Sequence, residues 1–436
     1  MANCTIISEI NDKMPVYSPI VFVVDSTDKL KCRFKYVCEI YVSKDSWYQQ
    51  NNTFTKVATM KEFPNPDGYG EFDIHRILEN YITHDLNGTA IGGAANPNSY
   101  VWYIVNFGVE FDDTIDCSGA VTFYNNIIDY QGIAWNGAFQ YDDFPNFMNS
   151  TGVADVFELT NSTKRFLTNH PSTGVTIAEN QTYQLSYFNY GVNYTTSLFV
   201  VDAYDSSGNL INSTSSDTDT EFPLDVGQDL ISIGVGTYNL AHTTPSTGSS
   251  PILPDNTAYY LVHIQGLTLD LLGLVPVSES LRFNIDRTCS KYDPITLTWL
   301  NRWGGFDTFT FTGKSVRTVP VKKTLYDKVY GKFFNPLWGW GSGGSGEGGT
   351  RGRTTLSVKA SDKTKLSTGW ISDEEATWLE ELFTSPQVFI AGQTVHFNNP
   401  VNVTSTSYEE KKTVNTKMIS YTIEIESATD KTIQRA

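Results

Sequence analysis

Short runs in which apolar and polar residues alternate are the feature that most restricts the fold of this chain. Residues 181–188 and 198–204 alternate in this way, and the turn formers at residues 205–209 follow the second run. A period of two places successive side chains on opposite faces of a strand, whereas a helix needs a period near 3.6. The pattern therefore predicts strands joined by hairpins.

The composition favours the same class of fold. Aromatic residues make up 13% of the chain and charged residues only 18%, and the abundant Val, Ile, Thr and Tyr fit a pleated, half-buried surface. A chain of 436 residues is long enough for about two to four domains with cores of their own. We therefore expect a mainly β, multi-domain protein.

The pattern divides the chain into three expected domains. Residues 1–150 form an N-terminal β-rich domain, with a small helix capped by Asp73 and a long, Asn- and Gly-rich surface loop at 125–152. Residues 151–287 have the clearest sandwich pattern, of the immunoglobulin-like or fibronectin-like kind. Residues 288–436 form a C-terminal α+β part, which starts with a hairpin and contains one well-defined helix.

That helix has clear signals at both ends. Ser372 is the expected N-cap, Glu375 completes a capping box, and Pro386 ends the helix. Its buried stripe is expected to hold Trp378, Leu379, Leu382 and Phe383. The stripe should pack on a sheet made from residues 387–390, 401–403 and 418–426.

Residues 314–353 form a basic, aromatic segment in an otherwise acidic protein. They hold eight Lys or Arg and two Asp or Glu, a net charge of +6, whereas the whole chain carries −17. A glycine-rich run at 341–346 lies beside large aromatic side chains and is too poor in side chains to cover them. The predicted contact residues are Tyr326, Tyr330, Phe333, Phe334, Trp338, Trp340, Lys322, Lys323, Lys328 and Lys332.

Three interpretations of this arm differ in what covers its aromatic rings. A disordered insertion would leave them uncovered, although six large aromatics are more than disordered segments usually carry. Single-stranded nucleic acid would stack on them and pair with the cations. A neighbouring subunit would bury the rings and face the cations with its acidic domains. We favour the third interpretation.

The two ends of the chain differ in charge. Residues 1–313 hold 15 Lys or Arg and 35 Asp or Glu, whereas residues 314–436 hold 16 and 13. One end of the protein can therefore attract the other end of a second copy. The same acidity opposes binding to phosphate backbones, so we expect no sequence-specific nucleic-acid partner.

No motif in the sequence supports catalysis. The segment Gly313-Lys314-Ser315 lacks the earlier glycine of a phosphate-binding loop, because residue 308 is Thr. The six histidines form no metal-binding pair, and no Gly-x-Ser-x-Gly elbow occurs. We expect a protein that is not an enzyme and that needs no cofactor or metal. Carboxylates that a glycosidase would require are interpreted as surface charge, at Asp112, Asp113, Asp116, Asp142 and Asp143. The alternating Asp217, Asp219 and Glu221 are interpreted as a solvated loop.

The cysteines and the lengths of the apolar runs indicate the cellular compartment in which the protein is made. Five cysteines, an odd number in a long chain, are expected to be reduced and scattered. The first 14 residues have no apolar run of signal-peptide length, and no run of about 18 apolar residues occurs. We expect a soluble protein that is made in the cytosol and has no membrane partner.

Five stretches of the sequence carry a resemblance to one group of proteins. They lie at residues 65–78, 166–169, 299–311, 369–386 and 417–426. Together they resemble virion structural proteins of tailed phages that infect Bacteroidetes, including the crAss-like phages. The resemblance touches all three expected domains. Its motifs are structural and specify no site.

The resemblance implies a ring-forming protein of the phage neck or tail, located in the virion and made in the cytoplasm of the bacterial host. Such a protein would form a cyclic homo-oligomer and contact other neck and tail proteins around the channel through which DNA leaves. An acidic wall there would let DNA pass without sticking. The alternative class is a tail-tip or capsid-surface protein that binds a host glycan.

Overall fold

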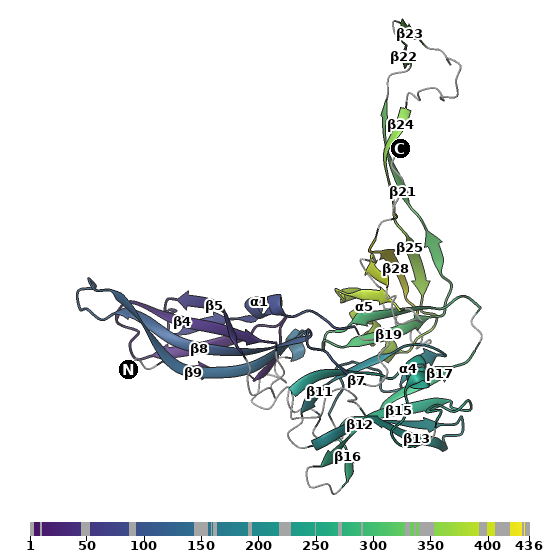
Figure 1. Cartoon of the computed structure of the whole chain (residues 1–436), viewed down its shortest axis with the longest axis horizontal. Helices are drawn as coiled ribbons and strands as arrows, with labels where there is room; N and C mark the ends of the chain where they lie inside the picture. Colours follow the sequence, from purple (N-terminus) through teal and green to yellow (C-terminus); the bar gives the residue numbers. More distant parts are fainter. Residues whose placement is uncertain are drawn as a thin grey trace.

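The chain is mainly β, as the alternating pattern predicts. The computed structural model describes residues 4–8, 11–44, 53–86, 93–143, 156–157, 159, 164–190, 194–217, 228–248, 250–268, 273–288, 291–327, 332–334, 337–339, 353–391, 399–405, 419–429 and 431. Figure 1 shows an elongated N-terminal body, a central body, a C-terminal body and a narrow ribbon that projects from the last of these.

Two sheets make up the N-terminal body. The smaller has the order β1-β3-β6 and contains β1 (Cys4–Ser8), β3 (Val21–Ser26) and β6 (Gly70–Asp73). The larger has the order β2-β9-β8-β4-β5 and contains β2 (Lys13–Pro15), β9 (Val121–Trp135), β8 (Tyr100–Asp112), β4 (Cys32–Ser43) and β5 (Thr55–Glu62). The core lies between them, where the Phe107 ring is 5.4 Å from that of Phe22 and 6.0 Å from that of Phe72.

The helix predicted after Asp73 is a single turn. It consists of α1 (His75–Leu78) and continues into η1 (Glu79–Tyr81). Its N-cap residue is Ile74, which has no side-chain oxygen. The carboxylate of Asp73 accepts hydrogen bonds from the backbone N–H of His75 at 3.3 Å and of Ile20 at 3.1 Å, so it also ties the helix to the sheet.

The surface loop predicted at 125–152 is wrong for its first part. Strand β9 continues to Trp135 and pairs with β8 along most of its length, from Asp112↔Val121 to Tyr100↔Trp135. The ladder is interrupted once, between Asn125 and Asp129, where its register shifts, and the pairing continues on both sides of this irregularity because the bonds of the ladder come from the backbone. The short helix η2 (Tyr141–Asp143) follows, and residues 144–152 lie outside the described part of the chain.

The expectation of five reduced cysteines is also wrong. Cys32 and Cys117 form a disulfide across a sequence separation of 85 residues, with their Cα atoms 5.4 Å apart. They meet because Cys32 begins β4 opposite Asp112, the last residue of β8, and Cys117 follows in the next loop. Sequence spacing alone does not reveal such a pair. Cys4 and Cys38 are free and buried, and Cys289 lies outside the described residues.

The central body is an immunoglobulin-like β-sandwich. One sheet has the order β10-β17-β15-β12-β13, with β16 paired to β15; its strands are β10 (Val175–Ala178), β17 (Leu281–Asp286), β15 (Tyr259–Thr268), β12 (Tyr194–Tyr204), β13 (Leu210–Asp217) and β16 (Leu274–Pro276). The predicted turn between β12 and β13 forms around Asp205, whose carboxylate accepts backbone bonds from Ser207 and Asn209 at 2.8 and 2.9 Å. Gly208 supplies the left-handed φ of +81° that this turn requires.

The second sheet of the sandwich includes one strand from the N-terminal part of the chain. It has the order β11-β14-β7 and contains β11 (Gln184–Tyr190), β14 (Gln228–Gly234) and β7 (Gly93–Ala95). Just after β7, the side chain of Asn96 bonds the hydroxyl of Ser232 on β14. The sandwich therefore includes a segment that lies far before the predicted boundary at residue 150. The short helix α4 (Thr237–His242) follows β14.

A seven-stranded sheet and one helix form the C-terminal body. The sheet has the order β19-β18-β26-β27-β28-β25-β20 and contains β19 (Phe306–Phe311), β18 (Ile295–Leu300), β26 (Val388–Ile390), β27 (Asn399–Val403), β28 (Thr422–Ser427), β25 (Lys363–Ser367) and β20 (Val316–Thr318). Helix α5 (Asp373–Thr384) has the predicted capping box between Ser372 and Glu375. Its buried Trp378 lies 5.1 Å from the Trp299 ring of β18, as the predicted packing requires.

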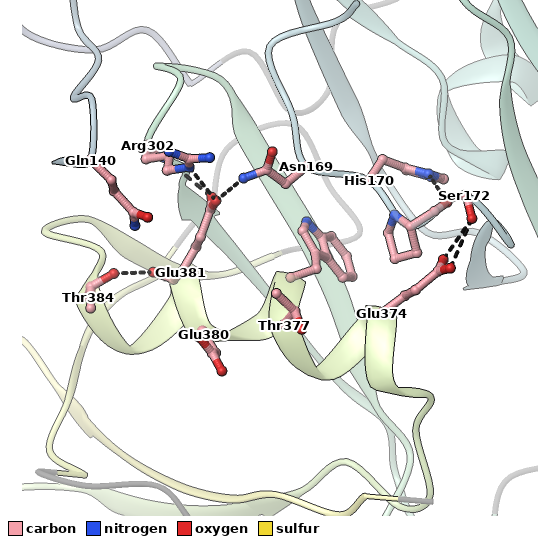
Figure 2. Close-up of a pocket in the computed structure, with 12 residues that line it drawn as sticks. Gln140, Asn169, His170, Ser172, Arg302, Glu374, Thr377, Glu380, Glu381 and Thr384 are labelled. Carbon is pink, nitrogen blue, oxygen red and sulfur yellow. Dashed lines mark hydrogen bonds and ion pairs between the residues drawn. The ribbon is translucent and has the colours of Figure 1, made fainter. Parts of the chain in front are cut away.

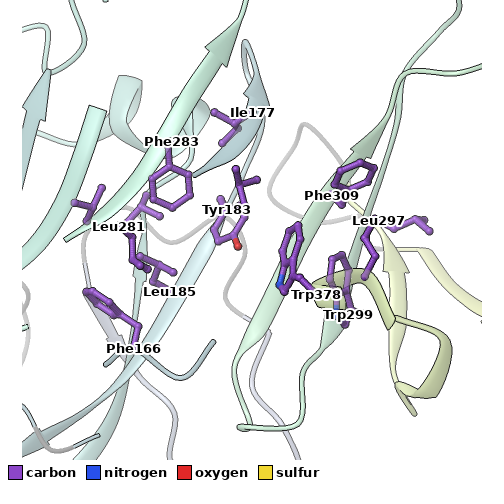
Figure 3. Packing of buried hydrophobic residues seen from close by; sticks show 14 of the residues in the cluster. Phe166, Ile177, Tyr183, Leu185, Leu281, Phe283, Leu297, Trp299, Phe309 and Trp378 are labelled. Carbon is purple, nitrogen blue, oxygen red and sulfur yellow. The ribbon is translucent and has the colours of Figure 1, made fainter. Parts of the chain in front are cut away.

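The sandwich and the C-terminal body share one hydrophobic core. Figure 3 shows Tyr183 and Phe283 of the sandwich on one side, and Phe309 and Trp378 of the C-terminal body on the other. The rings of Tyr183 and Phe283 are 5.1 Å apart, and those of Phe309 and Trp378 are 6.2 Å apart. Because buried side chains continue from one body to the other, the two cannot move independently without exposing apolar surface.

Candidate functional site

The predicted arm forms a two-stranded antiparallel ribbon. Strand β21 (Val321–Asp327) pairs with β24 (Arg353–Ala360) from Val321↔Ala360 to Asp327↔Arg353, and a short pair, β22 (Lys332–Phe334) and β23 (Leu337–Gly339), lies at its tip. All seven residues of β21 are exposed. The ribbon is a sheet of two strands, so neither of its edges pairs with another strand in the described part of the chain.

The structure places several of the predicted contact residues on this ribbon. Lys322, Lys323 and Tyr326 lie on β21 and are exposed. The backbones of Lys332, Phe333 and Phe334 form β22, and Phe333 pairs with Trp338 of β23. The remaining three, Lys328, Tyr330 and Trp340, lie outside the described residues.

Both faces of the ribbon mix apolar and cationic side chains. Side chains alternate along β21, so Val321, Lys323 and Leu325 share one face and Lys322 and Tyr326 share the other. Val321 and Leu325 are about half exposed, at 52% and 49%. The opposite face carries Lys322, which lies directly across from Lys359 on β24. Like charges opposite one another destabilise a strand pair unless an anion is near.

Sequence reasoning missed the second strand of this ribbon. The predicted arm ended at Arg353, so Leu356, Val358 and Lys359 were not among the predicted contact residues. Leu356 is the extra residue of a bulge in β24 and is 63% exposed. The alternation of polar and apolar residues at 354–359, after the glycine-rich run, would have indicated the return strand of a hairpin.

A groove of about 670 Å³ runs beside the polar face of α5. Figure 2 shows the side chains of α5 along one wall and those of the segment 169–172 above them. Most of the α5 residues that line it recur at spacings of three, four and seven residues, so they share one side of the helix, and Glu380 lies at the edge of that side. The α5 residues are Glu374, Thr377, Trp378, Glu380, Glu381 and Thr384, and the other lining residues are Gln140, Asn169, His170, Pro171, Ser172 and Arg302.

Arg302, the only Lys or Arg among the groove's lining residues, joins parts of the chain that are far apart in sequence. Its guanidinium bonds the carboxylate of Asp143 from the N-terminal part, lies 3.3 Å from Glu381 of α5, and stacks 4.1 Å from the ring centroid of Trp303. Asn169 completes the junction, because its amide bonds Glu381 and its oxygen accepts from Trp303 Nε1 at 2.9 Å. The charge of Arg302 is therefore already matched by carboxylates.

Trp303 belongs to the C-terminal body, but its side chain packs in the hydrophobic core of the N-terminal body. It is 2% exposed and lies in a tight turn between β18 and β19, where the side chain of Asn301 accepts bonds from the backbone of Trp303 and Gly305, both at 3.0 Å. The backbone oxygen of Trp303 accepts from Trp135 Nε1 at 3.0 Å. Its ring centroid is 4.9 Å from that of Phe157.

A buried carboxylate lies behind the groove. Asp307 of β19 is fully buried, and its Oδ1 accepts from the hydroxyl of Thr168 at 2.6 Å. Its Oδ2 accepts from Asn301 Nδ2 at 3.1 Å and from Trp378 Nε1 at 2.9 Å. Burial raises the pKa of Asp307, and these hydrogen bonds oppose that rise. The carboxylate therefore joins the linker at Thr168, the turn at Asn301 and helix α5.

Burial shifts two titratable groups of the groove in opposite directions. It raises the pKa of Glu381 to about 7, with a further contribution from the charge of Asp307. It lowers the pKa of His170 to about 4, against a hydrogen bond to the backbone oxygen of Pro171 that raises it. Glu381 therefore titrates near neutral pH, whereas His170 stays uncharged there.

A pH-dependent difference in stability should follow from Glu381. The folded chain keeps its proton up to about pH 7, whereas the unfolded chain releases it near 4.5, so this stabilisation is full below pH 4.5 and is lost as the pH rises to 7. Relative to the wild type, Glu381→Gln should gain about 2 to 3 kcal/mol of unfolding free energy between pH 5 and pH 8. Urea denaturation at several pH values measures the difference, and a constant difference would contradict the assigned shift.

The acidic loops considered for sugar cleavage have structural partners. Asp112 accepts from the backbone and hydroxyl of Thr114 at 3.0 and 2.7 Å, and Asp116 bonds Ser118 in the same manner. Asp143 pairs with Arg302. The described residues contain no cluster of three or more His, Cys, Asp or Glu placed to hold a metal ion. In that same part of the chain, none of the helices has the length and apolarity of a membrane span.

Comparison with known proteins identifies no family. No protein-family model matches the chain, and no curated protein matches it. Among solved structures, a marsupial T cell receptor is 10% identical, and the match covers 84% of this chain and 95% of that one with a TM-score of 0.17. At that TM-score the likeness carries no argument about function.

Proposed function

We propose that this chain is a structural subunit of a phage virion, a ring-forming neck or tail protein that assembles with copies of itself through the β21–β24 ribbon. The observation that carries the proposal is the ribbon itself. It projects from the C-terminal sheet (Figure 1) and every residue of β21 is exposed. An isolated two-stranded ribbon is marginally stable in water, so a partner surface would stabilise it.

The side chains of this region favour a protein partner. Four large apolar side chains of the ribbon, Val321, Leu325, Tyr326 and Leu356, are exposed by 37% to 63%, and Val316 and Val319 before β21 are exposed by 45% and 37%. Exposed apolar side chains gathered on one element mark interaction sites more often than chance, and burying them at a contact releases water from their surface. The lysines of the ribbon add a requirement for an acidic partner.

A second copy of the chain meets that requirement. The first 313 residues hold 35 acidic and 15 basic residues, so each copy offers a large acidic surface to the ribbon of another. A contact between ribbon and body uses two different surfaces, which produces rings when the rotation closes. The proposed placement in the neck or tail, next to other virion proteins and around the DNA channel, rests on the sequence resemblance.

Removal of the ribbon tests the assembly part of the proposal. Residues 322–359 are deleted, and Val321 is joined to Ala360 through an Asn-Gly turn, because these two residues are cross-strand partners. The wild type is expected to form particles several times heavier than its 48.7 kDa chain, whereas the deletion variant should be monomeric in light scattering. An unchanged unfolding transition of the variant serves as the folding control.

Two outcomes would count against the proposal. If the deletion variant still assembles as the wild type does, the ribbon is not the contact. If a cryo-EM map of the purified phage particle contains no density for this chain in the neck or tail, the proposed location is wrong even when assembly depends on the ribbon.

A further inference from the structure

We propose that the outer face of the larger sandwich sheet, β10-β17-β15-β12-β13, receives one face of the ribbon from a second copy of this chain. The inference rests on the proposed self-assembly and specifies an acceptor surface within the acidic first 313 residues. The occupant is the ribbon face that carries Val321, Lys323 and Leu325. The receiving surface is centred on Asp202 and Tyr204 of β12.

The strand register defines the residues of the receiving face. Directly opposed residues of an antiparallel strand pair lie on the same face of a sheet. Leu210 of β13, Tyr204 of β12 and Tyr259 of β15 are such partners and form one row. In the neighbouring row, Asp202 lies opposite Leu261. Four apolar or aromatic side chains therefore share this face with the carboxylate of Asp202.

These apolar side chains are partly exposed and firmly placed. Leu210 is 54% exposed, and Tyr204, Tyr259 and Leu261 are partly exposed. The two tyrosine rings are parallel, with their centroids 5.0 Å apart, and the guanidinium of Arg282 stacks 3.8 Å from the Tyr259 centroid. Because this stack already orders the rings, a partner that covers them causes little further loss of side-chain entropy. Tyrosine and arginine are also enriched at protein interfaces.

The sandwich segment has few cations to oppose a lysine. Residues 151–287 hold 14 Asp or Glu and 4 Lys or Arg, whereas residues 1–150 hold 19 and 9. Both segments carry a net charge of −10, but the sandwich segment reaches it with fewer than half as many cations. Its acidic surface is therefore less often interrupted by positive charge, which favours it as the partner of a basic ribbon.

Asp202 is the carboxylate of this face that a lysine of the ribbon would meet. Its side chain is 20% exposed; its Oδ1 accepts from the hydroxyl of Ser213 at 2.6 Å, and its Oδ2 lies 3.9 Å from His263 Nδ1, beyond hydrogen-bonding distance. Within the described residues, no Lys or Arg forms an ion pair with Asp202. Arg282, on the same face, donates instead to Asn284 at 2.8 Å. The Asp202 carboxylate can therefore accept a bond from an ammonium group.

The ribbon face with Val321, Lys323 and Leu325 has the matching chemistry. Across the strand pair, Val321 lies opposite Ala360 and Lys323 lies opposite Val358. Lys323 is thus a cation among apolar side chains, and in the described part of the chain it forms no ion pair. Sheets pack face to face through such side chains. Because burying either charge alone is costly, the alignment that pairs Lys323 with a carboxylate is favoured.

The two surfaces lie at opposite ends of the molecule. In Figure 1 the ribbon projects at the top, whereas strands β12, β13 and β15 lie at the bottom. The ribbon of one chain therefore does not meet the sandwich face of the same chain, and the contact joins two copies. Because the ribbon and the sandwich face are different surfaces, each copy donates a ribbon to one neighbour and receives a ribbon from the other.

Exchanging the charges of Asp202 and Lys323 tests the assignment. Asp202→Lys and Lys323→Asp should each weaken self-association of the full chain by about tenfold or more, because like charges then meet at the contact. A chain that carries both substitutions restores opposite charges and should regain most of the association. Analytical ultracentrifugation over a series of protein concentrations measures the association.

Matched controls make the same charge reversals outside the proposed contact. Lys322→Asp changes the adjacent lysine, which lies on the other face of β21, and Asp67→Lys changes an exposed carboxylate of the N-terminal body. Both should leave association within about threefold of the wild type, since exposed charges away from a contact contribute little. Circular dichroism and the unfolding transition of each variant serve as folding controls.

An apolar variant keeps the test valid if Asp202→Lys folds poorly. Leu210→Ser removes a side chain that is 54% exposed on the receiving face, and it should weaken association by about threefold to tenfold because less apolar surface is buried at the contact. Leu274→Ser is its control, because Leu274 is 45% exposed on β16, away from this face. Equal association of these two variants would contradict the assigned surface.

The outcomes separate this inference from the proposed function. If Lys323→Asp weakens association and neither Asp202→Lys nor Leu210→Ser does, the ribbon binds another surface and the sandwich assignment is wrong, while self-assembly stands. If the double variant fails to recover, Asp202 and Lys323 do not meet. If Lys322→Asp weakens association as much as Lys323→Asp, the assigned ribbon face is wrong. If deletion of the ribbon leaves assembly intact, the proposed self-assembly through the ribbon fails as well.

Discussion

Replacing Trp303 with alanine is expected to destabilise the protein by about 3 to 5 kcal/mol, the usual cost of removing a fully buried Trp side chain. Trp303 is 2% exposed, and its ring lies in the core of the N-terminal body although it belongs to the C-terminal part of the chain. The substitution leaves a cavity beside Phe157, removes the bond from Nε1 to Asn169, and takes away the surface on which Arg302 stacks.

Trp303→Ala should also loosen the contact between the N-terminal and C-terminal bodies. Limited proteolysis is expected to cut the variant faster near residue 140, because η2 is attached to the junction through Asp143 and Arg302. Trp370→Ala is the matched control, since the same side-chain type is removed from a position that is 73% exposed. Equal unfolding free energies for Trp303→Ala and Trp370→Ala in urea titrations would contradict the assigned role.

Asp307→Ala is expected to cost about 3 to 5 kcal/mol as well, for a different reason. Its carboxylate is the shared acceptor for donors from Thr168, Asn301 and Trp378, which come from three segments of the chain. Without it these donors stay buried and unpaired, and each such donor costs about 1 to 3 kcal/mol. Differential scanning calorimetry of the purified variant measures the loss.

The isosteric change separates shape from hydrogen bonding. Asp307→Asn keeps the volume but turns one acceptor oxygen into a donor, which then faces donors of its neighbours. Its expected cost is about 1 to 3 kcal/mol, less than that of Asp307→Ala, because the other oxygen still accepts. If Asp307→Ala were as stable as the wild type, the carboxylate would not hold these segments together.

The parts of the fold that depend on local sequence could be predicted. Strands β18 and β19 follow from alternation in residues 295–311, and helix α5 follows from its capping box and apolar stripe, because each pattern reports which face a residue presents to the core. The continuation of β9 through polar residues could not be predicted in this way. Its backbone partners come from β8, and a single segment does not reveal its partner.

The candidate sites also contain features that local sequence predicts and features that depend on residues far apart in the sequence. The charge and aromatic content of residues 314–353 pointed to an exposed element, but its return strand β24 lay beyond the glycine-rich run. The groove and its junction were not predicted at all, because Asp143, Arg302 and Glu381 are more than 70 residues apart from one another in sequence. The sequence did predict helix α5, which forms one wall of the groove. Its capping box indicates where the helix starts, and its apolar stripe indicates which face is polar.

The three-residue strand β7 bears on how the chain reaches its native state during synthesis. Its pairing partner β14 is made more than 130 residues later, as the bond between Asn96 and Ser232 shows. At synthesis rates of about 5 to 20 residues per second, β7 waits about 7 to 28 seconds on the ribosome-bound chain before β14 exists. The central sandwich thus closes only after the N-terminal body has been translated, and a polypeptide that begins after that body would present β14 as an open edge for intermolecular pairing.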